Sequence, residues 1–110
     1  MSLTAKTCTP CRGGIPPLTV GEAEKLLVHV SAWRLTHEGT RIEGRFDWPD
    51  FKSALAFVNR IGAIAEAQGH HPDITFGWGY CSVVLYTHKI KGLHENDFIL
   101  AAKIDALAAE

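Results

Sequence analysis

The segment that decides the fold is residues 66–97, EAQGHHPDITFGWGYCSVVLYTHKIKGLHEND. Gly69 suits the left-handed conformation that ends many helices, and Pro72 disfavours helix in the residue before it. Residues 73–78 and 80–88 then alternate in character on either side of Gly79, which predicts two antiparallel strands joined by a tight turn. The segment therefore predicts a helix end, a corner, a hairpin and the start of another helix.

A long amphipathic helix is predicted before the corner, with Pro49 in its first turn and its end near Gly69. Its apolar positions recur at helical spacing; they are Phe51, Ala54, Leu55, Val58, Ile61, Gly62, Ile64 and Ala65. Residues 33–48 alternate about a turn at Glu38 and Gly39, which predicts a first hairpin. Thr19 and Glu22 have the spacing of a capping box, so a first helix should begin there and reach about Val30.

The last predicted element is a helix over residues 93–110. Residues 1–18 carry several prolines and glycines without periodicity and are expected to form an arm rather than an element. The order αββαββα predicts an α+β two-layer sandwich: a four-stranded antiparallel sheet with three helices on one face, formed by a single domain over residues 19–110. The open sheet face and the edge strands favour self-association, so we expect a homodimer or homotetramer.

Composition excludes several classes of function. The 110 residues carry a formal net charge of −1 with scattered basic residues, which is not the pattern of a nucleic-acid-binding protein. No apolar run approaches the ~20 residues of a membrane span, and no secretory signal is recognisable, so a cytoplasmic location is expected. The three cysteines suit a reducing compartment. Cys8 and Cys11 form a CxxC, but nothing completes a zinc site, and we expect no metal there.

Three of the six histidines, His70, His71 and His88, lie within this segment together with Glu66 and Asp97. Histidine both gives and takes protons near neutrality because its ordinary pKa is about 6.5. One interpretation is acid and base catalysis, in which Glu66, one helical turn before His70, holds a histidine ring in one tautomer. No sequence pattern for acyl transfer, phosphoryl transfer or nicotinamide chemistry is present, which leaves a reaction of proton transfers.

Two other interpretations use the same side chains. The three histidines and one carboxylate have the composition of a metal site, although adjacent histidines such as His70 and His71 diverge along extended backbone. In the plainest interpretation, the histidine pair is a polar corner and His88 is a surface residue at the end of a strand. The residues alone leave these alternatives open.

The motif Glu66-x-x-x-His70-His71-Pro72, followed by Thr87-His88-x-x-x-Gly92-Leu93-x-x-x-Asp97, resembles the signature of the pterin-4a-carbinolamine dehydratases. The similarity extends to Trp33 at the start of the first predicted strand. It also includes the arm through Pro16, Pro17 and Leu18, which is similar to that of bacterial members. The αββαββα order is also that of the family.

The resemblance implies a lyase that dehydrates 4a-hydroxytetrahydropterin to quinonoid dihydropterin in tetrahydrobiopterin recycling, after aromatic amino acid hydroxylation. It implies a pterin substrate, a functional link to such a hydroxylase, and no cofactor or metal. By motif position, His70 and His88 would be the acid and base, and His71 would bind and orient the pterin. The implied substrate-binding or supporting residues are Glu66, Pro72, Thr87 and Asp97.

An alternative function comes from the same family. Animal members resemble a dimerisation cofactor for a homeodomain transcription factor, so this scaffold also suits a non-catalytic interaction or pterin-binding protein. The sequence does not decide which histidine is the acid, which pterin is physiological, or what Cys8 and Cys11 do.

Overall fold

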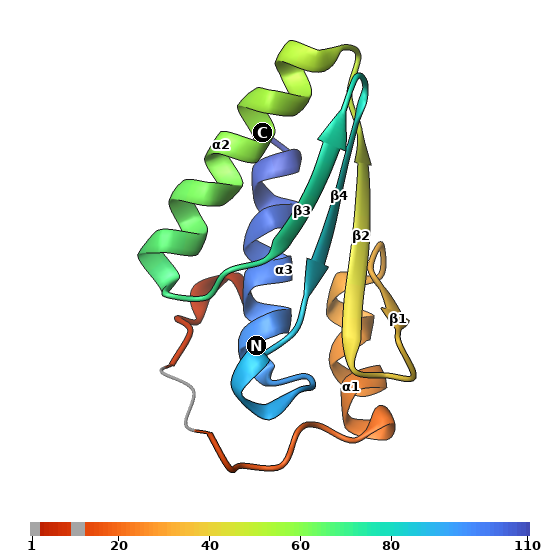
Figure 1. The fold of residues 1–110 in the computed structure, drawn as a ribbon, viewed down its shortest axis with the longest axis vertical. Coiled ribbons are helices and arrows are strands. Elements are labelled where there is room, and N and C mark those ends of the chain that lie inside the picture. The colour runs from red at the N-terminus through yellow and green to blue at the C-terminus, as the bar shows by residue number, and fades with distance from the viewer. Residues whose placement is uncertain (1–2, 10–12) are drawn as a thin grey trace.

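The computed structural model describes residues 3–9 and 13–110 and confirms the predicted order of helices and strands (Figure 1). The three α-helices are α1 Val20–Leu27, α2 Phe51–Gln68 and α3 Glu95–Ala108. The strands are β1 Arg34–Thr36, β2 Arg41–Asp47, β3 Asp73–Gly77 and β4 Tyr80–Leu85. Short 3₁₀ helices occupy η1 Leu3–Ala5, η2 Val28–Val30 and η3 His88–Ile90.

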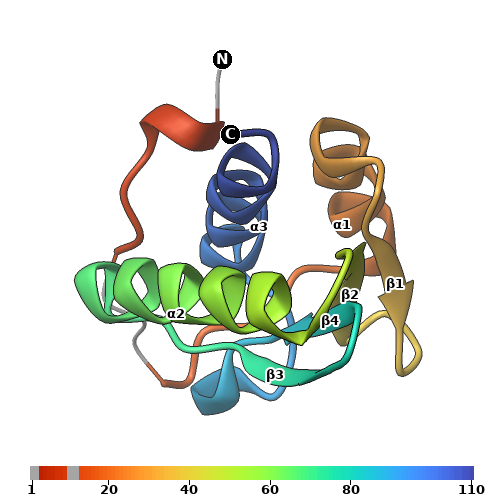
Figure 2. The same ribbon diagram turned by 90° about the horizontal axis from the view of Figure 1, so that it is seen from above.

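The four strands form one antiparallel sheet in the order β1-β2-β4-β3. The central pair, β2 and β4, places Ile42 opposite Leu85 and Phe46 opposite Cys81. Seen from above, α1, α2 and α3 all lie on the same side of this sheet (Figure 2). The α+β two-layer architecture predicted from the sequence is therefore confirmed.

The core lies between the sheet and the helices. One face of the two central strands is turned to the core, because alternate residues of a strand point to the same side; its fully buried side chains are Ile42, Cys81, Val83 and Leu85. The helices supply the other half of the core, with Ala54, Phe57, Ile61 and Ala65 from α2 and Phe98, Leu100, Ala101 and Ile104 from α3. This packing fixes how the α2 C-terminus and the α3 N-terminus meet at one end of the sheet.

The predicted helix ends are largely confirmed. Thr19 and Glu22 form the expected capping box of α1, and Gly69 ends α2 with a φ of 64° in the left-handed region. Pro49 is not in the first turn of α2, however. Asp50 is the N-cap and accepts a hydrogen bond from the Ser53 backbone N–H at 2.8 Å, so Pro49 precedes the helix.

Three other predictions need correction. The strand expected to reach His88 ends at Leu85, and His88 begins η3. The apolar stripe of α2 is only partly buried, because Phe51 remains 43% and Leu55 38% exposed. The N-terminal arm contains one short element, η1, whose Leu3 is buried in the core.

The helices that the structure describes include none long and apolar enough to cross a bilayer. Cys8 is buried and unpaired. Cys11 lies outside the described residues, so the predicted absence of a metal at the CxxC stays a prediction.

Candidate functional site

The corner after α2 carries His70. The left-handed Gly69 turns the chain, and the backbone N–H of His70 donates to the Ala65 carbonyl at 3.2 Å, which holds the corner against the end of the helix. The ring of His70 is nearly buried, and its Nε2 lies 2.6 Å from Oδ1 of Asp97. The His70 ring is therefore fixed from both its backbone and its side chain.

Asp97 is completely buried in the first turn of α3. Its Oδ2 accepts a hydrogen bond from Oγ1 of Thr87 at 2.9 Å and another from the backbone N–H of His94 at 3.0 Å. A carboxylate offers only acceptors, so the proton of the His70 contact is on Nε2 of His70. That tautomer leaves Nδ1 of His70 as a lone-pair acceptor, able to take a proton.

Glu66 pairs with His71 rather than with His70. The carboxylate of Glu66 contacts Nε2 of His71, and both side chains are largely exposed. The histidine ring that Glu66 holds is therefore that of His71, and the carboxylate that contacts the His70 ring is that of Asp97. Pro72 follows directly and leads into β3.

His88 follows Thr87, whose side chain is part of the site. The backbone of Thr87 forms an isolated bridge with Gly92, which ends the sheet and starts the η3 turn. Thr87 points inward to Asp97, and the next side chain, His88, is exposed. The His88 ring packs on that of Tyr86, with 4.1 Å between the ring centroids. Hydrogen bonds therefore connect the side chains of His70, Asp97 and Thr87. His71 and His88 are the sequence neighbours of His70 and Thr87, and their own side-chain contacts are with Glu66 and Tyr86.

Metal ligation, which the sequence left open, finds no geometric support in residues 3–9 and 13–110. No three histidine, cysteine, aspartate or glutamate side chains of these residues lie together as a metal site would require. The three histidines face three different partners: a buried carboxylate, a surface carboxylate and an aromatic ring.

Two residues that the sequence motif did not single out, His94 and Asn96, support the site at the start of α3. Nδ1 of His94 accepts from the Asn96 backbone N–H at 3.0 Å, so His94 is the N-cap of α3. The Asn96 side chain binds the N-terminal arm through two hydrogen bonds to Thr9. Its Oδ1 accepts from the Thr9 backbone N–H at 3.0 Å, and its Nδ2 donates to the Thr9 carbonyl at 2.6 Å. His94 lies three residues before Asp97, the capping-box spacing, but histidine is uncommon at this cap position.

Cys8 packs beside these hydrogen bonds, and its Sγ lies 3.6 Å from the carbonyl oxygen of Asn96. Burial raises the pKa of the Cys8 thiol to about 11. A thiol with such a pKa is protonated and unreactive near neutral pH. Cys8 therefore belongs to the packing of the arm.

Comparison with known proteins places this arrangement in a family. The family model described as "Pterin 4 alpha carbinolamine dehydratase" matches residues 16–107. A curated protein of Methylococcus capsulatus, provisionally named pterin-4-alpha-carbinolamine dehydratase, is 62% identical over 99% of this chain and 96% of its own length. One of Halorhodospira halophila with the same provisional name is 56% identical over 99% of this chain and all of its own length.

Two solved structures also resemble the fold. A "transcriptional coactivator/pterin dehydratase" from Brucella melitensis is 29% identical with a TM-score of 0.79, over 84% of this chain and 98% of that one. A "pterin dehydratase-like protein" identified as a RuBisCO assembly factor in the alpha-carboxysome is 29% identical with a TM-score of 0.62, over 72% and 92% of the two chains. On the evidence of the family model and the full-length relatives, this chain belongs to the pterin 4 alpha carbinolamine dehydratase family.

Proposed function

We propose that this protein is a 4a-hydroxytetrahydropterin dehydratase that releases water from its substrate to form quinonoid dihydropterin. The observation that carries the proposal is the buried hydrogen-bonded chain from His70 through Asp97 to Thr87, with His88 next in sequence. It supplies one imidazole with a fixed tautomer and a second in a different environment. Two such groups suit a reaction that needs one acid and one base.

The chemistry has two proton transfers. One imidazole protonates the 4a-hydroxyl group as it leaves, so that the C–O bond breaks to give water. The other accepts the proton of the ring nitrogen whose electron pair expels that group. His70 is the candidate base because its Nδ1 is an acceptor. His88, the exposed residue that follows Thr87, is then the candidate acid.

The other predicted site residues have supporting roles in this proposal. His71 binds and orients the pterin, with Glu66 holding its ring at the surface. Pro72 fixes the corner, and Thr87 and Asp97 hold the two catalytic histidines in place. The substrate is used as part of pterin recycling beside an aromatic amino acid hydroxylase, which generates the carbinolamine. No cofactor takes part in these proton transfers.

A direct assay tests the proposal. The carbinolamine is generated with an aromatic amino acid hydroxylase, and its disappearance is followed with and without folded protein. We expect an acceleration over the spontaneous loss, and an unchanged rate would refute the enzyme.

Substitution of the two histidines tests their roles. His70→Ala and His88→Ala should each lower turnover at least tenfold, about 1.4 kcal/mol of barrier. The matched control His37→Ala changes an exposed histidine of the β1–β2 turn and should retain activity. Full activity in both site variants would contradict the assignment.

A non-catalytic interaction protein on the same scaffold is the second candidate. It is favoured by the two structural neighbours, one described as a transcriptional coactivator/pterin dehydratase and the other as a RuBisCO assembly factor. The same assay separates the candidates, because an interaction protein leaves the spontaneous rate unchanged.

A further inference from the structure

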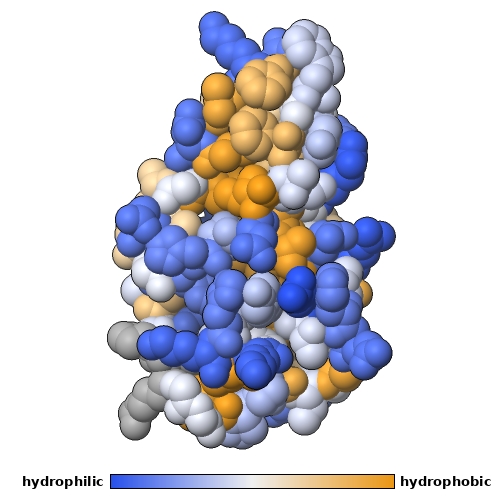
Figure 3. Space-filling model, viewed as in Figure 1, coloured by the Kyte–Doolittle hydropathy of each residue, from blue (hydrophilic) through white to orange (hydrophobic). Residues whose placement is uncertain are grey.

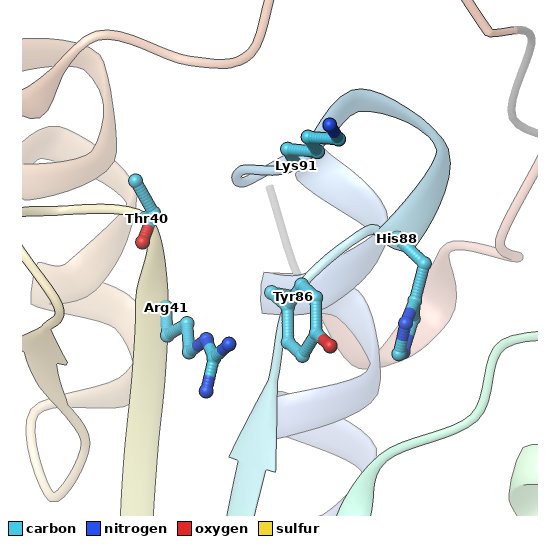
Figure 4. Close-up of a pocket in the computed structure, with 5 residues that line it drawn as sticks. All are labelled: Thr40, Arg41, Tyr86, His88 and Lys91. Atoms are coloured by element: carbon cyan, nitrogen blue, oxygen red, sulfur yellow. The ribbon is translucent and has the colours of Figure 1, made fainter.

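His88 forms part of the lining of a surface pocket. This pocket is a cavity of about 400 Å³ lined by Thr40, Arg41, Tyr86, His88 and Lys91. Figure 4 shows these side chains arriving from β2, from the end of β4 and from the η3 turn, with Tyr86 between Arg41 and His88. Two of the five lining residues carry a permanent positive charge, and no lining residue carries a negative one.

Arg41 is held in place without a carboxylate. Its guanidinium carbon lies 4.3 Å from the centroid of the Tyr86 ring, a cation–π contact that orients the group. Among the ion pairs of the described residues, none includes Arg41. A planar guanidinium suits a phosphate or carboxylate.

Two other arginines on the outer face of the sheet differ from Arg41. Arg45, also on β2, makes a similar contact with Tyr80 at 4.8 Å, but its Nε also pairs with Asp47 at 3.2 Å. Arg34 pairs with Glu43 at 2.9 Å. Of the arginines at positions 34, 41 and 45 on this face, only Arg41 has no carboxylate partner among the described residues.

Lys91 adds a second charge from an unfavourable backbone conformation. It is one of three non-glycine residues in the described part of the chain with positive φ, at 52°, where glycine would be free of strain. A lysine in such a conformation, beside a pocket, points to a role for its side chain. Within residues 3–9 and 13–110, Lys91 also has no ion-pair partner.

We propose that this pocket is an anion subsite that holds a phosphate or carboxylate on the side chain of the pterin. The inference rests on the proposed function, because His88 is shared: its ring lines the pocket while its neighbour Thr87 bonds to Asp97. A pterin ring placed beside His88 would direct a ring substituent toward Arg41 and Lys91. The substrate class is thus a pterin carbinolamine with an anionic side chain.

The test compares 6-hydroxymethylpterin with its phosphate monoester, which differ by one phosphate group. Binding to the full chain is measured by pterin fluorescence and calorimetry at low and high salt. We expect the monoester to bind at least tenfold more tightly than the alcohol, with the preference reduced by salt. Equal affinities would overturn the subsite and leave the proposed dehydration untouched.

Two variants and a matched control test whether the preference for the phosphate monoester arises in this pocket. Arg41→Gln and Lys91→Gly should each reduce the ratio of the two affinities at least threefold; Lys91→Gly also removes the strain, so its fold is retained. Arg45→Gln removes an arginine from the same strand and the same kind of aromatic contact, and the ratio should not change. An equal loss in Arg45→Gln would show a general surface effect and would refute the assignment.

Inorganic phosphate separates failure of the subsite from failure of the proposed function. Titrated alone, it should shift the backbone amide NMR signals of Thr40, Arg41 and Lys91, whether or not pterins bind. Shifts without any pterin binding or turnover would refute the dehydratase and keep the anion site. Pterin binding without these shifts, and without a preference for the monoester, would refute the anion site alone.

Discussion

At the scale of the residue, Asp97 is the side chain of the site that hydrogen-bonds to the most partners. It accepts hydrogen bonds from the His70 ring, the Thr87 hydroxyl and the His94 backbone while completely buried. Its partners come from the α2–β3 corner, the end of β4 and the start of α3. One carboxylate therefore joins three parts of the chain, and its loss should affect both stability and chemistry.

Asp97→Ala tests this convergence. The substitution leaves buried donors without an acceptor, which we expect to lower the free energy of unfolding by about 3 to 5 kcal/mol. Urea denaturation measures it. The control Asp73→Ala removes an exposed carboxylate from β3 and should change stability by no more than about 0.5 kcal/mol. Equal effects in the two variants would contradict the role of Asp97.

Asp105 predicts a dependence of stability on pH. Burial raises the pKa of Asp105, although the Trp33 Nε1–H donates to its Oδ1 at 2.8 Å and partly opposes the shift. An acid whose pKa is raised by folding binds its proton more tightly in the folded state, so it contributes stability at low pH. That contribution is lost as pH rises from the ordinary value of 3.8 through the raised one.

Asp105→Asn removes this dependence. The amide oxygen still accepts from Trp33 but carries no charge to bury, so the melting temperature at pH 7 should rise by about 1 to 4 °C. The gain should vanish below the ordinary pKa of aspartate, where the wild-type side chain is protonated. Melting curves across pH measure it, with the exposed Asp47→Asn as control. A gain that is constant with pH would contradict the explanation.

At the scale of the element, the end of α2 positions the histidine pair. Gly69 stops the helix at a φ of 64°, and a Cβ built on it would meet no atom within 4 Å. Gly62, in the middle of the same helix, has equally open surroundings. The two glycines therefore differ only in backbone conformation.

The same substitution at these two positions should have opposite effects. Gly69→Ala forces an L side chain into the left-handed region and should cost about 1 kcal/mol of unfolding free energy. Gly62→Ala removes a flexible residue from a helix interior and should add about 0.5 to 1 kcal/mol. Urea denaturation of both variants checks the signs. Two effects of the same sign would show that the conformation at Gly69 is not what ends the helix.

At the scale of the whole molecule, the outer surface over α2 and β3 is partly apolar. Phe51 is 43%, Leu55 38% and Trp78 74% exposed, and the Phe51 ring lies 5.5 Å from that of Phe76. Hydrophobic colour gathers over the upper part of the molecule in Figure 3, where these elements lie in Figure 1. Exposed apolar patches commonly mark association surfaces, which agrees with the homodimer or homotetramer expected from the sequence.

Self-association is measurable by sedimentation velocity. We expect the wild-type chain to sediment as a dimer or tetramer at micromolar concentration, and Leu55→Glu to shift it toward the monomer by placing a charge in the patch. Ala63→Glu, at another exposed position of α2, is the matched control and should sediment like the wild type. A monomeric wild-type chain would refute the expectation.

Local signals explain why most of the fold was predictable. The capping box at Thr19, the glycine at 69 and the alternation of β2 and β4 act through neighbouring residues, so a sequence displays them directly. The error at His88 comes from a turn that the alternating pattern does not reveal. Alternation continues past Leu85, but the bridge between Thr87 and Gly92 turns the chain away from the sheet.

The sequence by itself determined the order of elements, the two-layer architecture and the set of histidines and carboxylates, because each depends on spacing along the chain. Only the tertiary structure decided which carboxylate pairs with which histidine. Asp97 rather than Glu66 holds His70, since packing of α2 against α3 brings together residues 27 positions apart. The cationic pocket at His88 is likewise tertiary, because Arg41 on β2 and Lys91 after η3 are far apart in the sequence yet line the same cavity.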